Sequence, residues 1–201
     1  MRARARFLLP LLLCGGLLSA CASAPSHEEI QASFEAGLKD YDAHDYKAAY
    51  EKWKKIADFD LAAMRNVALM LRKGEGVDKD PKAAQTMMQQ AADAGLATAE
   101  ADLADMLLKG EAGKPDPKAA VPWLQTAAEA GHPVAAFELG QLYEQGTVVK
   151  KDLEQARKLY KVAADAGVKD AAESLDRLGP EAAPTGQVGA LPPSPPPPLR
   201  H

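Results

Sequence analysis

Cysteine and aromatic side chains are scarce in this chain of 201 residues. The two cysteines are Cys14 and Cys21, and aromatic residues make up 5% of the sequence. Because Cys14 falls in an N-terminal segment that we expect to be removed, no disulfide bond can form within the remaining chain. Binding of single-stranded nucleic acid requires clustered Lys and Arg residues interleaved with aromatic residues, and the chain has no such cluster. These absences argue against a disulfide-stabilised domain and against a nucleic acid partner.

The chain also lacks the side-chain combinations that enzymes and metal sites use. The segment HEE at residues 27–29 begins like the zinc motif H-E-x-x-H, but Gln31 stands where the second histidine belongs. Turn and capping roles account for His44 and His132. No serine has a lysine three residues later, which excludes the simplest penicillin-recognising acyl-enzyme motif. We therefore expect no catalytic residues, no metal site, no cofactor and no enzymatic activity.

The first 21 residues have the features of an export signal. A basic start carries Arg2, Arg4 and Arg6, and residues 7–18 are apolar with one break at Pro10. This apolar run falls short of the ~20 residues that span a membrane comfortably. The segment LSAC at residues 18–21 resembles the bacterial lipobox, which implies cleavage before Cys21 and lipid attachment to its sulfur. The alternative is cleavage after the A-x-A pattern at residues 22–24, but Pro25 would then follow the cleaved bond.

These features predict a lipoprotein signal peptide at residues 1–20 and a lipidated tether at residues 21–27. Loss of the three signal arginines leaves 21 Lys and Arg against 28 Asp and Glu, a net charge of −7. Such a body is repelled by anionic membrane surfaces, so the lipid anchor would be the only membrane contact. Ala22 after the lipidated cysteine, rather than Asp, is compatible with outer-membrane sorting. We expect an exported protein anchored in the bacterial envelope at the periplasmic face of the outer membrane.

A segment of the chain recurs three times at an offset of 36 residues. AADAG at residues 91–95 returns as AAEAG at 127–131 and as AADAG at 163–167. The same offset relates two further triplets of single residues, which are Asp80, Asp116 and Asp152, and Gly74, Gly110 and Gly146. A fixed period in the thirties is typical of stacked two-helix units that bury their apolar faces against neighbouring units.

Start and stop signals place the helices within each unit. Asp80 and Asp116 each precede a proline, the pattern of an N-cap followed by the first helical position. Gly95 fits the left-handed residue that ends a helix. The sequence predicts an all-α repeat domain at residues 28–178, a right-handed α-solenoid of about four helix pairs plus a capping helix near 170–178. Residues 179–201, with PPSPPPP at 192–198, are expected to be a disordered proline-rich tail.

Residues 138–167 resemble the Sel-one-like repeat, a relative of the tetratricopeptide repeat. The nine matching positions are Leu139, Gly140, Tyr143, Gly146, Ala156, Tyr160, Ala163, Ala164 and Gly167. Two other units match less fully, since Ala104 and Ala68 replace the first glycine of the pattern. The N-terminal unit, with Gly37 and Trp53, looks like a plain tetratricopeptide repeat.

This resemblance implies a protein or peptide ligand held in a concave groove lined by the first helix of each pair. Carried over residue by residue, the ligand-facing offsets select Phe34, Leu38, Tyr41, Arg65, Leu69, Arg72, Lys73, Asp105, Leu108, Lys109, Phe137, Gln141 and Glu144, with Ala101 and Gln145 at the same offsets. The cations among them would form a basic centre suited to an acidic peptide. The function expected is a membrane-anchored interaction scaffold. The alternatives are a cell-wall-related enzyme, penicillin-binding or hydrolase-like, and a secreted or exposed host-interaction factor using the same groove.

Overall fold

A computed structural model describes residues 24–179, and within that range all regular secondary structure is α-helical. The helices there are α1 (His27–Asp42), α2 (Tyr46–Ile56), α3 (Leu61–Lys73), α4 (Pro81–Asp93), α5 (Ala97–Lys109), α6 (Pro117–Glu129), α7 (Pro133–Gln145), α8 (Leu153–Asp165) and α9 (Lys169–Leu178). The expected signal peptide, the lipidated Cys21 and all of the proline-rich tail except Gly179 lie outside the described residues. No helix between residues 24 and 179 is long and apolar enough to cross a membrane.

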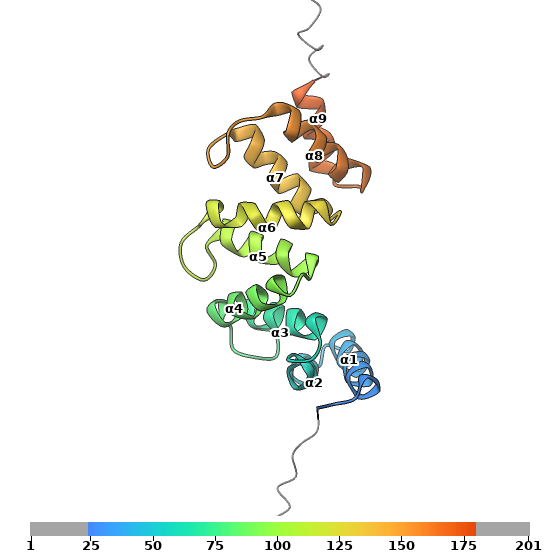
Figure 1. Ribbon diagram of the computed structural model, residues 1–201. Coiled ribbons are helices and arrows are strands. Elements are labelled where there is room, and N and C mark those ends of the chain that lie inside the picture. The colour runs from blue at the N-terminus through green and yellow to red at the C-terminus, as the bar shows by residue number, and fades with distance from the viewer. Residues whose placement is uncertain (1–23, 180–201) are drawn as a thin grey trace, which may run out of the picture.

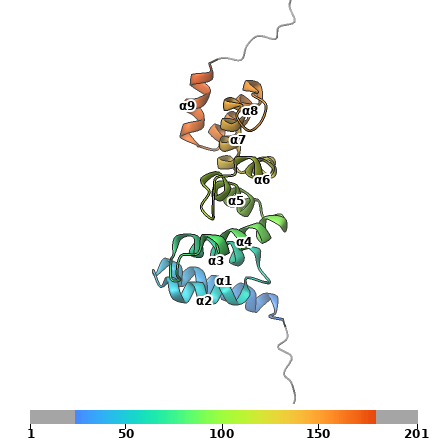
Figure 2. The same cartoon turned by 90° about the vertical axis from the view of Figure 1, so that its left-hand side faces the viewer.

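The helices stack in chain order into an elongated solenoid. Figure 1 shows α1 and α2 at one end of the stack and α9 at the other, and the view in Figure 2 agrees. Each helix makes most of its tertiary contacts with the helix before it and the helix after it. The all-α solenoid of four helix pairs plus a final helix is therefore confirmed.

The start of the first helix differs slightly from the expected domain boundary. His27, assigned above to the tether, is the first residue of α1. The cause is a capping box, in which the Ser26 side chain accepts a hydrogen bond from the Glu29 backbone and Glu29 accepts one from the Ser26 backbone. The helix thus begins directly after Ser26.

The repeated aspartates connect the two helices of a pair in two ways. The backbone N–H of Asp116 donates to the carbonyl oxygen of Leu107 at 2.8 Å and closes the loop that follows α5. Its carboxylate accepts from the Ala119 backbone N–H at 2.9 Å and caps α6. Asp80 and Asp152 make the equivalent pair of contacts in the preceding and following units. One residue type at one position therefore fixes both the loop and the helix after it.

Helix pairs approach closely where a glycine faces an aromatic ring. A Cβ atom built on Gly140 would lie 2.7 Å from the Tyr160 ring, and one built on Gly37 would lie 2.4 Å from Trp53. Where Ala68 and Ala104 replace this glycine, the residues at the offset of Tyr160 are Met88 and Leu124. Glycine thus occupies this position only where the facing side chain is aromatic.

The apolar core runs without interruption along the stack. Its three groups of buried residues share partly buried neighbours, because Trp123 and Leu107 pack against the first two groups while Tyr143 and Leu159 pack against the last two. Trp53 is buried in the first group. The continuous core makes the row of first helices a fixed surface.

Candidate functional site

The predicted groove residues lie on the surface formed by α1, α3, α5 and α7, called here the first-helix face. Contacts join these helices directly. Tyr41 on α1 donates a hydrogen bond to Glu75 just beyond α3, Arg65 on α3 pairs with Asp102 on α5, and α5 contacts α7. The face is therefore one surface that crosses all four helix pairs.

An apolar pocket of about 210 Å³ opens on this face between α1 and α3. It is lined by Leu38, Tyr41, Trp53, Asn66, Leu69, Met70, Lys73 and Glu75. Four of these, Leu38, Tyr41, Leu69 and Lys73, are predicted groove residues, so the structure brings the N-terminal part of the predicted set together. Leu38 is 42% exposed at this pocket.

The walls of this pocket are fixed by packing and hydrogen bonds. The Tyr41 ring lies 5.7 Å from the Trp53 ring and 5.1 Å from the Tyr46 ring. The Tyr41 hydroxyl donates to Glu75 at 2.9 Å, and this bond raises the pKa of Tyr41. Asn66 adds an amide, which both donates and accepts hydrogen bonds. The pocket therefore suits an apolar side chain whose backbone passes beside Asn66.

The centre of the first-helix face holds a network of ion pairs. Arg72 donates to Glu111 from Nε at 2.6 Å and also pairs with Asp105, and Lys109 pairs with Asp105 at 2.7 Å. The Arg72 bond lowers the pKa of Glu111. Burial acts to raise the pKa of Asp105, but its bonds to Lys109 and Arg72 outweigh burial and lower it. The carboxylates of this network are therefore firmly ionised.

The expected basic centre is corrected by these pairs. Each of its cations already has a carboxylate partner, since Arg65 bonds Asp102 at 2.6 Å and Lys73 lies 3.6 Å from Glu75. Each arginine pairs with acidic residues of the neighbouring unit, which lie about one repeat away in the sequence. The centre is thus a balanced network, and a positive patch awaiting an acidic peptide is absent from it.

The C-terminal part of the predicted set serves mainly to pack the last helices. Phe137 lies 5.6 Å from the Tyr160 ring. Glu144 accepts from the Tyr160 hydroxyl at 2.6 Å and pairs with Arg177 on α9, and the Arg177 bond lowers its pKa. Gln141 is partly exposed on the same helix.

Two further members of the set, and Ala101, belong to the core. Phe34 lies 6.1 Å from the Trp53 ring, and Leu108 packs against the middle of the core. Ala101 is buried. These residues hold helices together, so the members of the predicted set that remain available to a ligand are those of the pocket and the central network, together with the partly exposed Gln141.

Sequence reasoning missed a row of polar residues next to the predicted positions. Asn66, Asp102 and Glu138 follow one another at offsets of 36 residues on α3, α5 and α7. Asn66 lines the apolar pocket, and Asp102 binds Arg65. The available signal was a polar residue at the same position of three successive units, directly after a position selected for the groove.

Glu138 is electrostatically unlike its neighbours. It is partly buried and makes no hydrogen bond or ion pair with another residue in the described part of the chain. Its pKa is raised to about 7, chiefly by burial; the nearby Asp105 and Asp102 also raise it, while Lys109 and Arg72 lower it. A carboxylate in this setting is stabilised by any cation that approaches it.

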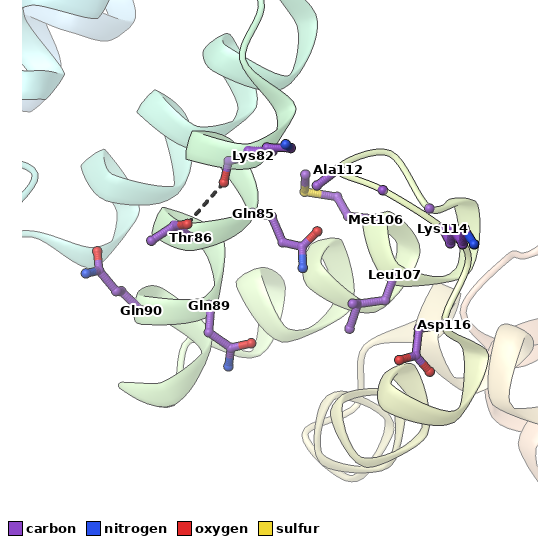
Figure 3. A pocket seen from close by; sticks show the side chains of 12 residues that line it. Lys82, Gln85, Thr86, Gln89, Gln90, Met106, Leu107, Ala112, Lys114 and Asp116 are labelled. Atoms are coloured by element: carbon purple, nitrogen blue, oxygen red, sulfur yellow. Dashed lines mark hydrogen bonds between the residues drawn. The ribbon is translucent and has the colours of Figure 1, made fainter.

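Two other hollows lie near the loops between the helices of a pair. One, of about 560 Å³, lies between α4 and the segment 110–116; Figure 3 shows Lys82, Gln85 and Gln89 on α4 and Lys114 on the loop across from them. The other, of about 600 Å³, is lined by Arg72, Lys73, Lys79, Pro81 and Glu111. Neither has the aromatic wall of the first-helix pocket.

Two histidines in the described part of the chain, His132 and His44, have local partners. The His132 ring nitrogen accepts from the Ala135 backbone as the N-cap of α7, and the His44 ring bonds the Tyr46 hydroxyl at 3.0 Å. No group of three or more His, Cys, Asp or Glu in this range is placed to hold a metal ion. The capping role expected for His132 is confirmed.

Comparison with known families gives three consecutive matches to the Sel1 repeat, at residues 61–96, 97–132 and 133–168. Together they cover more than half of the chain, and each begins at or next to the first helix of a pair. A comparison with curated proteins gave no significant match.

Several solved structures are similar to the chain. A Sel1 repeat protein from Oxalobacter formigenes is 34% identical with a TM-score of 0.67, over 71% of this chain and 58% of that one. A protective antigen of uropathogenic Escherichia coli with an SLR fold is 26% identical with a TM-score of 0.69, over 74% and 33%. The chain thus spans less than two thirds of either protein. Cysteine rich protein B of Helicobacter pylori, 20% identical with a TM-score of 0.51 over 63% and 96%, shares the fold.

Proposed function

The chain belongs to the Sel1 repeat family, and on this premise we propose that it is a lipid-anchored scaffold of the bacterial cell envelope that holds a partner protein on its first-helix face. Sel1 repeat proteins generally mediate protein–protein interactions, and this chain has the same repeats in the same solenoid. The proposal adds the surface that binds, the anchor and the location.

One observation carries the choice of surface: the pocket between α1 and α3 combines an aromatic wall with a solvent-exposed leucine. Exposed apolar residues that line a concave, pre-formed site favour burial of a partner's side chain. Covering Leu38 would remove apolar area from water at about 25 cal/mol per Å². The pocket walls are already held by Tyr41 and Trp53, so binding requires little reordering of the scaffold.

The anchor and the location are supported by the N-terminal sequence. A basic start, a short apolar run and the LSAC segment at residues 18–21 are the features that a lipoprotein signal combines. Acyl chains on Cys21 would hold the solenoid close to its membrane, with the first-helix face free to bind soluble or membrane partners. The net negative body would itself stay off anionic lipid.

The anchor is tested by metabolic labelling with an alkyne fatty acid. The proposal expects label on the full-length chain, loss of label and retention of the precursor with Cys21→Ser, and fractionation with the outer membrane. Label that persists in Cys21→Ser, or a soluble wild-type protein, would overturn the anchor. Protease added to intact cells distinguishes a periplasmic solenoid from one exposed outside.

Partner binding is tested by chemical crosslinking in native envelopes, followed by mass spectrometry. Leu38→Glu places a charge in the exposed part of the pocket, whereas the control Val162→Glu changes an exposed valine (47%) on α8. The proposal expects a partner crosslinked to wild type and to the control but lost from Leu38→Glu. Equal recovery of the partner by wild type and both variants would mean that the binding surface lies elsewhere.

A further inference from the structure

One carboxylate near the centre of the first-helix face, that of Glu138, has no cation paired with it in the described part of the chain. Around α3 and α5, four cations are paired with four carboxylates: Arg65 and Arg72, Lys73 and Lys109 against Asp102, Asp105, Glu75 and Glu111. Glu138 on α7 lies near this network, and no cation in the part of the chain that the structure describes pairs with it. A partner that brings its own cation would supply the missing pair.

The groups around Glu138 do not supply that balance. Asp102, Asp105 and Lys109 of α5 and Arg72 of α3 act on it from a distance, and the two cations are already bound to other carboxylates. Burial and the two aspartates hold its pKa near 7, far above the ordinary 4.5. The ionised form of Glu138 is thus unfavourable in the free protein, and an incoming ammonium or guanidinium group would stabilise it by direct pairing.

The apolar pocket and Glu138 lie in one register on the same face. Asn66 in the pocket wall and Glu138 occupy the same position of units separated by two repeats. Each step runs from one first helix to the next, with a second helix packed between them. A ligand that reaches both positions must therefore be an extended segment of several residues, at ~3.3–3.6 Å each.

From this geometry we propose that the first-helix face recognises a basic segment of a partner protein, which places an apolar side chain in the pocket between α1 and α3 and a Lys or Arg side chain against Glu138. The inference rests on the proposed function and specifies the chemistry of its ligand. It replaces the acidic peptide expected from the sequence with a basic one, because the cations that suggested an acidic peptide are paired within the fold.

The test selects random peptides of about 12 residues, displayed on phage, against the full-length protein in detergent at pH 8. The expected peptides carry Lys or Arg more often than the starting library, together with a large apolar residue. Synthetic copies should bind Glu138→Gln and Leu38→Glu at least tenfold more weakly than wild type. The matched controls Glu51→Gln on α2 and Val162→Glu on α8, both at exposed positions, should bind as wild type does.

The pH dependence of binding gives a second readout. If the free protein's Glu138 has a pKa of about 7 and the bound protein's is much lower, affinity falls about tenfold from pH 8 to pH 6, because the ionised fraction falls by that factor. Glu138→Gln should remove this dependence. Binding that is unchanged between the two pH values in wild type would contradict direct pairing.

The remaining outcomes separate this inference from the proposed function. Acidic peptides that lose affinity with Lys79→Gln would overturn the basic ligand and assign binding to the hollow beside Arg72. Basic peptides insensitive to Glu138→Gln would also overturn it, as would recovery of no peptide at all. In each case a native partner that still depends on Leu38 would leave the scaffold function standing.

Discussion

Nε of Arg72 on α3 donates to Oε2 of Glu111 at 2.6 Å, which ties the second helix pair to the loop inside the third. The two residues are 39 positions apart in the sequence, so the bond spans neighbouring repeats. The Arg72 side chain is only 15% exposed. It therefore acts as a connector between repeat units.

Arg72→Gln should destabilise the fold, because it leaves the partly buried Glu111 without its cation and Asp105 with Lys109 alone. A loss of about 1–3 kcal/mol in the free energy of unfolding is expected from removing one member of such a network. Urea unfolding at pH 7 measures it. Lys161→Gln, which removes an exposed pair with Asp165, is the matched control and should change stability little.

The effect of Arg72→Gln should fade in acid. Arg72 lowers the pKa values of Glu111 and Asp105 below their ordinary 4.5 and 3.8. Carboxylates with lowered pKa stabilise the fold above their unfolded-state values, and this stabilisation is lost as pH falls through the lowered ones. Unfolding curves of wild type and variant should therefore converge near pH 2–3. A gap of unchanged size there would show that the arginine acts through packing alone.

Glu138→Gln should stabilise the protein at pH 8. The folded-state pKa of Glu138 is raised to about 7, so its contribution to stability is fully present below about pH 4.5 and is lost as pH rises through 7. The neutral amide avoids this loss, and a gain of about 1–2 kcal/mol at pH 8 is expected. The difference from wild type should shrink below pH 5. A destabilised variant at pH 8 would mean that Glu138 has a favourable partner within the fold.

Gly140→Ala should be costly only while Tyr160 is present. The added Cβ would lie 2.7 Å from the ring, and relief of such overpacking costs about 1–3 kcal/mol. Together with Gly140→Ala, Tyr160→Leu gives this unit the Ala and Leu pair already found at Ala104 and Leu124. In that background Gly140→Ala should cost clearly less. Equal costs in a double-mutant cycle would contradict the size matching.

Asp116→Ala should lower stability by about 1 kcal/mol through loss of the cap on α6. Asp116→Asn keeps a side-chain oxygen at the same place and should stay close to wild type. Thermal unfolding of both variants measures the contrast. Equal losses would point to the charge of Asp116 instead of its capping bond.

The fold was predictable because its signals are local and repeated. The 36-residue offset, the aspartate N-caps and the glycines that end helices each depend on a few neighbouring residues, and the structure has all of them in register. Gly95, Gly131 and Gly167 indeed have positive φ angles.

The site was predicted only in part, since ion pairing depends on side chains that meet across units. Arg65 and Asp102 are 37 positions apart, and Arg72 and Asp105 are 33 apart, close to one repeat in both cases. Opposite charges near one period apart would have indicated that the basic centre is neutralised. The pKa of Glu138 depends on burial, which no spacing in the sequence reports.

Charge reversal at Arg72 or Lys109 would disturb the fold as well as any ligand, because both residues hold carboxylates of the scaffold. Tests of binding are therefore better placed at Leu38 and Glu138. The central claim is that a partner contacts the first-helix face of the folded, anchored protein. A photo-crosslinking amino acid placed in living cells at single positions tests this contact without removing any interaction.

The decisive measurement compares crosslinks from Leu38 and Gln141 on the first-helix face with crosslinks from Val162 on α8 and Glu51 on α2. The account predicts that one partner protein is captured from both first-helix positions and from neither of the other two. Capture from Val162 or Glu51, with none from Leu38 and Gln141, would contradict it.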